Sequence, residues 1–167
     1  MKITVEWLRD EGACVEGIYW FEAQKQTDAA KILRTLMKED RFDWANWTIV
    51  RLLDKRGRVE YAVFAAERVI DIYEKKYPKD SRPRQAIEAV KGWLEKPNQM
   101  NRRAAADAAH AAAHAAAHAA AHAAAYGTAH AAAHAAAYAA AKVKAKKVLQ
   151  GKILEYGISL LQEKKGA

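Results

Sequence analysis

The stretch DAAKILRTLMKED, residues 28–40, decides the fold class of this chain. Its large apolar residues recur with the period of an α-helix and share one face: Ile32, Leu33, Leu36 and Met37. Thr27 precedes the stretch as the expected cap, and the carboxylate of Asp28 complements the positive end of the helix dipole. The stretch therefore predicts an amphipathic helix that buries one face in a core.

The regions on both sides carry the same helical period, and none alternates over a useful length with the two-residue period of a strand. The chain is therefore expected to be all-α. The further helices that period and caps predict cover residues 5–12, 15–24, 43–55, 58–77 and 81–96. Residues 55–57 are expected to form a turn. Pro78 ends the helix before it, because the residue preceding a proline avoids the helical region.

Aromatic residues and the cysteine are expected to contribute to the core. All five tryptophans fall on apolar helical stripes and are predicted to pack mostly in the interior: Trp7, Trp20, Trp44, Trp47 and Trp93. Cys14 is the only cysteine, which excludes an internal disulfide and a CxxC metal or redox motif. Small and apolar neighbours predict that its side chain is buried.

Beyond residue 100 the composition changes to an alanine-rich tract, from about residue 104 to residue 141. We expect residues 1–100 to form a helical domain, with residues 101–167 as an alanine-rich helical extension packed on it rather than an independent domain. Gly127 interrupts the tract and lowers helix preference by about 1 kcal/mol relative to alanine. A break there predicts a helical bundle or array with a long alanine-rich helical hairpin at its C-terminal end. One uninterrupted helix is the alternative.

A histidine or tyrosine stands at every fourth position of this tract: His110, His114, His118, His122, Tyr126, His130, His134 and Tyr138. Adjacent histidines have the spacing of a metal clip, but the tract lacks the further ligands of a closed site, so no metal cofactor is expected. Two other interpretations stay open. Two arms of a hairpin would line a groove for a nucleotide-like ligand, or the side chains would only space close-packed alanine faces.

The segment KKYPKDSRPR, residues 75–84, places two arginines in the first turn of a predicted helix, with Asp80 or Ser81 as its cap. The helix dipole disfavours cations at this end, so Arg82 and Arg84 need compensation. Asp80 supplies it if it forms an internal ion pair. Alternatively, the two guanidinium groups and Lys79 form a binding site for a phosphate or carboxylate ligand.

The formal net charge is +8, and residues 142–152, KVKAKKVLQGK, contribute five lysines without an acid. Such a segment either attracts anions or only keeps an apolar helix in solution. No helix-turn-helix or zinc signature favours nucleic acid as a partner. The charged N-terminus lacks the apolar run of a signal peptide, and the alanine tract is too weakly hydrophobic to span a membrane. We expect a cytoplasmic protein without a membrane partner.

Three segments carry a resemblance to a known family: WLRDEGACVEGIYWF at residues 7–21, DWANWTIVRLL at 43–53 and YEKKYPKDSRPRQAIEAVKGWLEKP at 73–97. Together with the alanine-rich tail, they make the chain resemble the putative immunity proteins of bacteria and their phages. The resemblance covers roughly the first hundred residues. It implies a small helical protein that binds and neutralises a toxic partner, and the regular HAAAH spacing departs from it.

The sequence contains no GxSxG, HExxH, phosphate-binding loop or dinucleotide-binding motif, so we expect no enzyme. The function expected instead is non-catalytic neutralisation of the immunity or phage counter-defence type, by stoichiometric binding of a toxin protein or a small anionic nucleotide-like signal. Two other classes stay open. One is a metal-binding protein that uses histidine pairs, and the other is a structural module that forms a homo-oligomer.

Overall fold

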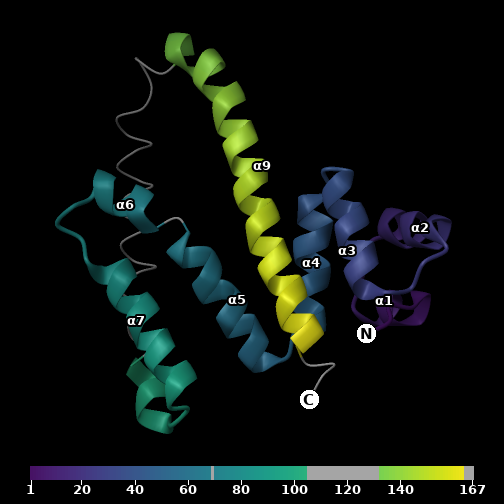
Figure 1. The fold of residues 1–167 in the computed structure, drawn as a ribbon, viewed down its shortest axis with the longest axis horizontal. Coiled ribbons are helices and arrows are strands. Elements are labelled where there is room, and N and C mark those ends of the chain that lie inside the picture. Colours follow the sequence, from purple (N-terminus) through teal and green to yellow (C-terminus); the bar gives the residue numbers. More distant parts are fainter. Residues whose placement is uncertain (69, 105–131, 164–167) are drawn as a thin grey trace. The chain divides into compact units, whose positions relative to one another are not determined.

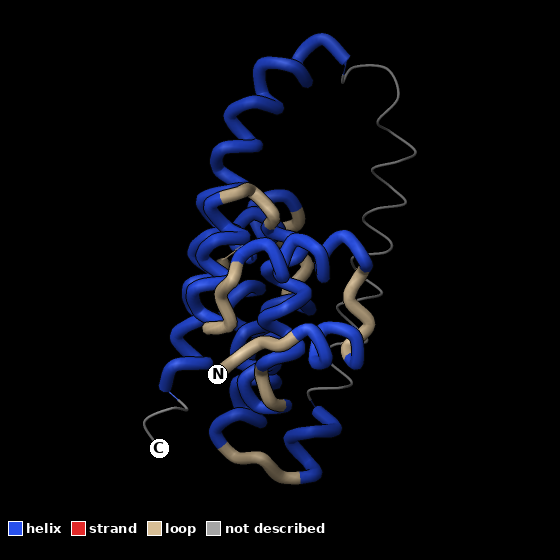
Figure 2. The backbone as a smooth tube through the Cα atoms, turned by 90° about the vertical axis from the view of Figure 1, so that its right-hand side faces the viewer, coloured by secondary structure: helices blue, strands red, loops and turns tan. Residues whose placement is uncertain are grey.

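The computed structural model describes residues 1–68, 70–104 and 132–163 (Figure 1). Within these ranges the regular structure is helical, and Figure 2 shows helices joined by loops without a strand. Within the described ranges an isolated antiparallel β-bridge pairs Lys2 with Asp28. The predicted all-α class is confirmed for the described residues.

The chain divides into two compact units, of which the first combines both ends of the sequence: Met1–Arg58 and Lys147–Ala167. Its helices are α1 (Val5–Asp10), α2 (Val15–Gln24), α3 (Ala29–Lys38), α4 (Phe42–Leu52) and the C-terminal part of α9 (Ala132–Glu163). The most deeply buried large side chains of the described residues all belong to this unit: Ile3, Leu33, Ile49, Leu53 and Ile158. The core of this unit is therefore shared between its N-terminal helices and α9.

Local chemistry sets the limits of the first helices. Gly12 has a φ of 74°, which glycine adopts without strain, and α1 ends just before it as predicted. The cap of α3 is Asp28 rather than the predicted Thr27, because the Asp28 Oδ1 atom accepts the Lys31 N–H at 3.1 Å. The backbone oxygen of Thr27 instead accepts the Ile3 N–H at 2.8 Å.

The amphipathic face predicted for α3 is confirmed, since Ile32, Leu33 and Leu36 are buried. Two ion pairs join the outer side of this region to α9. Arg34 pairs with Glu155 at 3.2 Å, and Lys147 of the basic segment pairs with Asp40 at 2.6 Å. Exposed pairs of this kind stabilise a fold by only about 0–1 kcal/mol, so the buried apolar residues contribute more to the packing of α9.

The second unit, Val59–Lys146, contains most of α5 (Lys55–Glu67), α6 (Ile70–Lys76) and α7 (Arg82–Glu95). The predicted turn at residues 55–57 is wrong. These residues begin α5, because the Asp54 carboxylate accepts the Gly57 N–H at 2.8 Å and serves as a cap. A single helix was predicted for residues 58–77, but the structure divides it into α5 and α6. Nothing in the described residues explains this division. Helix α6 ends before Pro78, as predicted.

Helix α9 begins at Ala132 in the described part of the chain, and its side chains are described from residue 147 onward. The predicted break at Gly127 lies outside the described residues, so the hairpin stays a prediction. No helix of the described ranges combines the length and the hydropathy that a membrane crossing requires.

Candidate functional site

The first candidate site is the start of α7, where both predicted arginines bind carboxylates of the same unit. The Arg84 guanidinium donates to both carboxylate oxygens of Glu74, at 2.5 and 2.6 Å, and to Asp71 Oδ1 at 3.3 Å. The hydrogen bonds from Arg84 lower the pKa of Glu74, and the Glu74 carboxylate raises the pKa of Arg84. The fold therefore favours the ionised forms of both Glu74 and Arg84.

Asp80 holds the other arginine and also accepts a backbone N–H at the start of α7, whose N-cap residue is Ser81. Arg82 donates through Nε and Nη2 to the two oxygens of Asp80, at 2.8 and 2.9 Å, and its backbone N–H donates to Asp80 Oδ1 at 3.1 Å. The Tyr73 hydroxyl donates to Asp80 Oδ2 at 2.8 Å. These hydrogen bonds, those of Arg82 above all, hold the pKa of Asp80 well below its usual range, and the Asp80 carboxylate raises the pKa of Tyr73.

This geometry favours internal compensation, the first of the two interpretations of Arg82 and Arg84. Each guanidinium uses its Nε and Nη2 atoms on carboxylates of its own unit, so its charge is already balanced within the fold. Lys79 is exposed beside them. An anion-binding role for these residues stays a hypothesis.

The histidine and tyrosine repeat lies outside the described side chains. His110, His114, His118, His122, Tyr126 and His130 precede the described part of α9, and His134 and Tyr138 belong to its first turns, where side chains are not described. Among the residues that are described, no three His, Cys, Asp or Glu side chains gather in a way that could hold a metal ion.

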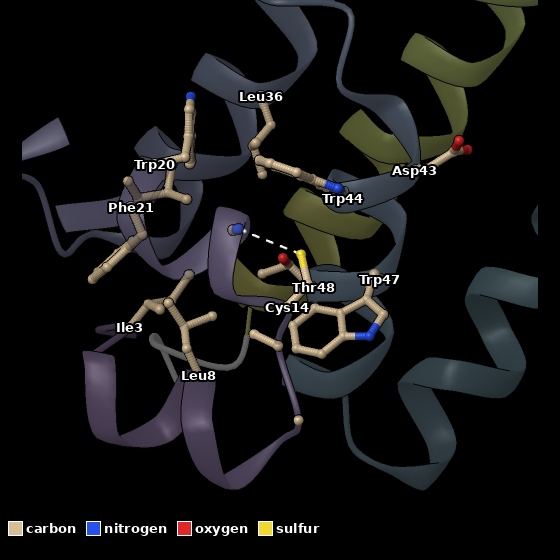
Figure 3. Close-up of a pocket in the computed structure, with 14 residues that line it drawn as sticks. Ile3, Leu8, Cys14, Trp20, Phe21, Leu36, Asp43, Trp44, Trp47 and Thr48 are labelled. Carbon is tan, nitrogen blue, oxygen red and sulfur yellow. Dashed lines mark hydrogen bonds between the residues drawn. The ribbon is translucent and has the colours of Figure 1, made fainter. Parts of the chain in front are cut away.

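The second candidate site is a cavity of about 330 Å³ within the first unit, which we call the indole pocket (Figure 3). Its aromatic lining comes from two helices, with Trp20 and Phe21 on α2 and Trp44 and Trp47 on α4. Buried aliphatic residues of α1, α3 and the N-terminal segment complete the apolar wall: Ile3, Leu8, Ile32 and Leu36. The cavity is therefore almost wholly apolar.

Edge-to-face contacts and hydrogen bonds fix the indole rings. The Trp20 and Trp44 centroids lie 6.2 Å apart at 72°, and Trp47 meets Trp7 at 6.4 Å and 69°. Trp20 Nε1 donates to Glu39 at 2.8 Å. Such aromatic pairs contribute about 0.5–1.5 kcal/mol beyond their buried area, so these contacts add to the stability of the aromatic cluster.

Two arginines lie against the same rings. The Arg41 guanidinium is 4.4 Å from the Trp44 ring and pairs with Glu39 at 3.1 Å. The Arg51 guanidinium is 3.9 Å from the Trp47 ring and pairs with Glu11 at 3.6 Å. Cation–π contacts of exposed groups contribute about 0.5–1 kcal/mol each. Each of these arginines also has a carboxylate partner, so its charge is locally balanced.

The loop between α1 and α2 borders the pocket through Gly12, Ala13 and Cys14. The prediction that Cys14 is buried is wrong, since its side chain is exposed. Cys14 is the cap of α2, and its Sγ atom accepts the Gly17 N–H at 3.4 Å, as the dashed line in Figure 3 shows. The thiol therefore stands at the rim of the cavity and not in the core.

The sequence did not reveal this pocket. All five tryptophans were expected mostly in the interior, yet each is only half-buried. The available signal was the density of indoles: Trp44 and Trp47 share one helix face three residues apart, and Trp20 follows the small-residue loop around Cys14. Periodicity alone cannot distinguish a filled core from a lined cavity.

Comparison with known proteins gives one finding. The family model described as Imm-5 like putative immunity protein matches residues 49–163. The match includes the alanine-rich tract and leaves out residues 1–48, although the resemblance was expected to cover roughly the first hundred residues. No curated protein and no solved structure matches the chain.

Proposed function

Because the chain belongs to the Imm-5 like putative immunity protein family, which implies an immunity-type role, we propose that it neutralises a toxic protein by stoichiometric, non-catalytic binding. The observation that carries this proposal is the match over residues 49–163 of a chain of 167 residues. An inhibitor of this kind needs a stable surface and no reacting group.

The arrangement of charges supports a protein target over a small anionic signal. The best sequence candidates for an anion site, Arg82 and Arg84, already bind Asp80 and Glu74 through paired hydrogen bonds. A nucleotide-like ligand would therefore meet guanidinium groups whose charge these carboxylates already balance. The indole pocket, by contrast, offers an apolar surface of the kind that protein interfaces use at their centres.

Co-expression tests the proposal. A candidate toxic protein is induced in bacteria with and without the chain, and growth and the mass of the purified complex are measured. The expected result is rescue of growth with a complex of fixed stoichiometry. Rescue by a small catalytic amount of the chain, without a complex, would contradict the proposal.

The same preparation tests the nucleotide alternative. Small molecules released by denaturing the purified chain are identified by mass spectrometry. A retained nucleotide derivative that is lost in an Arg82→Gln variant would favour an anionic signal as the target. An extract without nucleotides, beside a stable protein complex, supports the protein target.

A further inference from the structure

We propose that the indole pocket binds a small neutral aromatic molecule, about two fused rings in size, whose one polar group forms a hydrogen bond with Thr48. The pocket is lined by residues between 3 and 48, whereas the family match begins at residue 49. The inference therefore goes beyond the proposed function, and it is tested on the chain alone.

Thr48 supplies a polar group without a partner in an apolar wall. It lies on α4, lines the cavity, and is only 5% exposed, which makes it the one buried polar side chain of the described residues. Its hydroxyl has no hydrogen-bond partner among these residues. Figure 3 draws one hydrogen bond between lining residues, from Gly17 to Cys14, and none to Thr48, which stands between the Trp44 and Trp47 rings in this view.

The Thr48 hydroxyl is also accessible from the cavity. No side-chain nitrogen or oxygen of the described residues is both fully enclosed and without a partner, so the unpartnered Thr48 oxygen keeps some accessible surface. Because the rest of this side chain is buried, that surface lies on the cavity that Thr48 lines. A buried hydroxyl without a partner costs free energy, and a ligand group that bonds to it removes this cost.

The volume and the walls of the pocket suit a flat molecule of two rings. The cavity of about 330 Å³ is roughly twice the size of an engineered apolar cavity of about 150 Å³ that binds benzene. Three indoles and Phe21 supply aromatic walls, which bind aromatic rings by offset stacking and edge-to-face contact. An apolar lining with few polar groups that fix orientation is typical of small-molecule sites.

The charges around the pocket favour a neutral ligand. The two arginines that lie against the indole rings are each paired with a carboxylate: Arg41 with Glu39 and Arg51 with Glu11. Asp43 is the one charged residue of the lining, and in Figure 3 its carboxylate turns away from the other labelled side chains. A charged molecule would lose its hydration in this cavity without gaining an opposite charge, which a neutral molecule avoids.

A ligand can enter the pocket from solvent. Three of the lining residues are exposed, with Gly12 and Cys14 in the loop between α1 and α2 and Asp43 in the first turn of α4. The buried lining residues, Thr48 among them, form the inner wall. The site is therefore open at one side and apolar within.

The first experiment titrates 2-naphthol into the full chain at pH 7, where a phenol is neutral, and follows the five indole N–H signals by NMR. Saturable shifts are expected for Trp20, Trp44 and Trp47, with a Kd of about 10 µM to 1 mM for a molecule of this size. Trp93 in the second unit is the internal control. Absence of a saturable shift, or an equal shift of Trp93, would overturn the proposal.

A charged analogue tests the preference for a neutral ligand. The ion 2-naphthalenesulfonate has the same rings but carries a negative charge, so it should bind at least about tenfold more weakly than 2-naphthol. Equal or tighter binding of the sulfonate would show that charge in the pocket is compensated, and the proposed ligand class would be wrong.

The variant Thr48→Val tests the hydrogen bond, because valine has nearly the same shape and no hydroxyl. The preference for 2-naphthol over naphthalene, measured as the ratio of their Kd values, should fall about threefold to tenfold. The matched control is Thr35→Val, which removes a hydroxyl that donates to the Lys31 carbonyl at 3.0 Å outside the pocket, and it should leave the ratio unchanged. An unchanged ratio in Thr48→Val would overturn the proposal.

Urea unfolding of the free variants completes the design. Because the Thr48 hydroxyl has no partner in the free chain, Thr48→Val should not lower the urea midpoint. A clear fall of the midpoint would show that the hydroxyl already has a structural partner, which contradicts the proposal. None of these measurements uses a toxic partner, so their failure leaves the proposed function standing, and failure of the co-expression test leaves this site standing.

Discussion

Replacement of Ile158 by alanine tests whether the C-terminal helix completes the core of the first unit. Ile158 lies on α9 and is fully buried, although 100 residues separate it from Arg58, the last N-terminal residue of that unit. The substitution removes three buried carbons at about 0.8 kcal/mol each, and the residual cavity adds to this loss. The free energy of unfolding should therefore fall by about 2–4 kcal/mol.

Urea unfolding followed by tryptophan fluorescence measures this loss, because four of the five tryptophans belong to the first unit. Val148→Ala is the matched control, since Val148 lies on the same helix but is 54% exposed. Its effect should stay within about 0.5 kcal/mol. If Ile158→Ala costs less than about 1 kcal/mol, or no more than the control, α9 does not belong to this core and the reasoning is refuted.

Further predictions concern single groups. Burial raises the pKa of Tyr61 to about 12, so stability from its neutral form is present below pH 10 and lost as pH rises through 12. The ultraviolet titration should show a late phenol that Tyr61→Phe removes, while the raised pKa of Tyr73 persists in this variant. The fold lowers the pKa values of Asp80 and Glu74, so both carboxylates stabilise it above the pKa values of the unfolded chain, and this stabilisation is lost on acidification. Asp80→Asn should therefore reduce the loss of stability at acidic pH, which urea unfolding measures.

The helices whose limits depend on local chemistry were predictable from the sequence. The expected range 15–24 is the observed α2, and the apolar face of α3 is buried at Ile32, Leu33 and Leu36. Asp80 was also identifiable as the ion-pair partner of Arg82, because the two residues are neighbours in the chain. Spacing and dipole arguments work where the partner is close in sequence.

The indole pocket and the shared core required information that local patterns do not contain. Trp20 and Trp44 lie on different helices, and only their packing shows that a cavity remains between them. The exposure of Cys14 has the same origin, because its Sγ atom caps α2 and a helix cap lies at the surface. Gly57 predicted a turn, but the Asp54 carboxylate accepts the Gly57 N–H and caps a helix there. A side-chain cap can therefore outweigh the turn preference of a glycine.

The most direct test of the account is a titration of the toxic partner's activity with this chain. Stoichiometric neutralisation predicts a linear loss of activity that ends at a fixed ratio of the two proteins. Inhibition by a small fraction of an equivalent, or no inhibition at an excess of the chain, would contradict it.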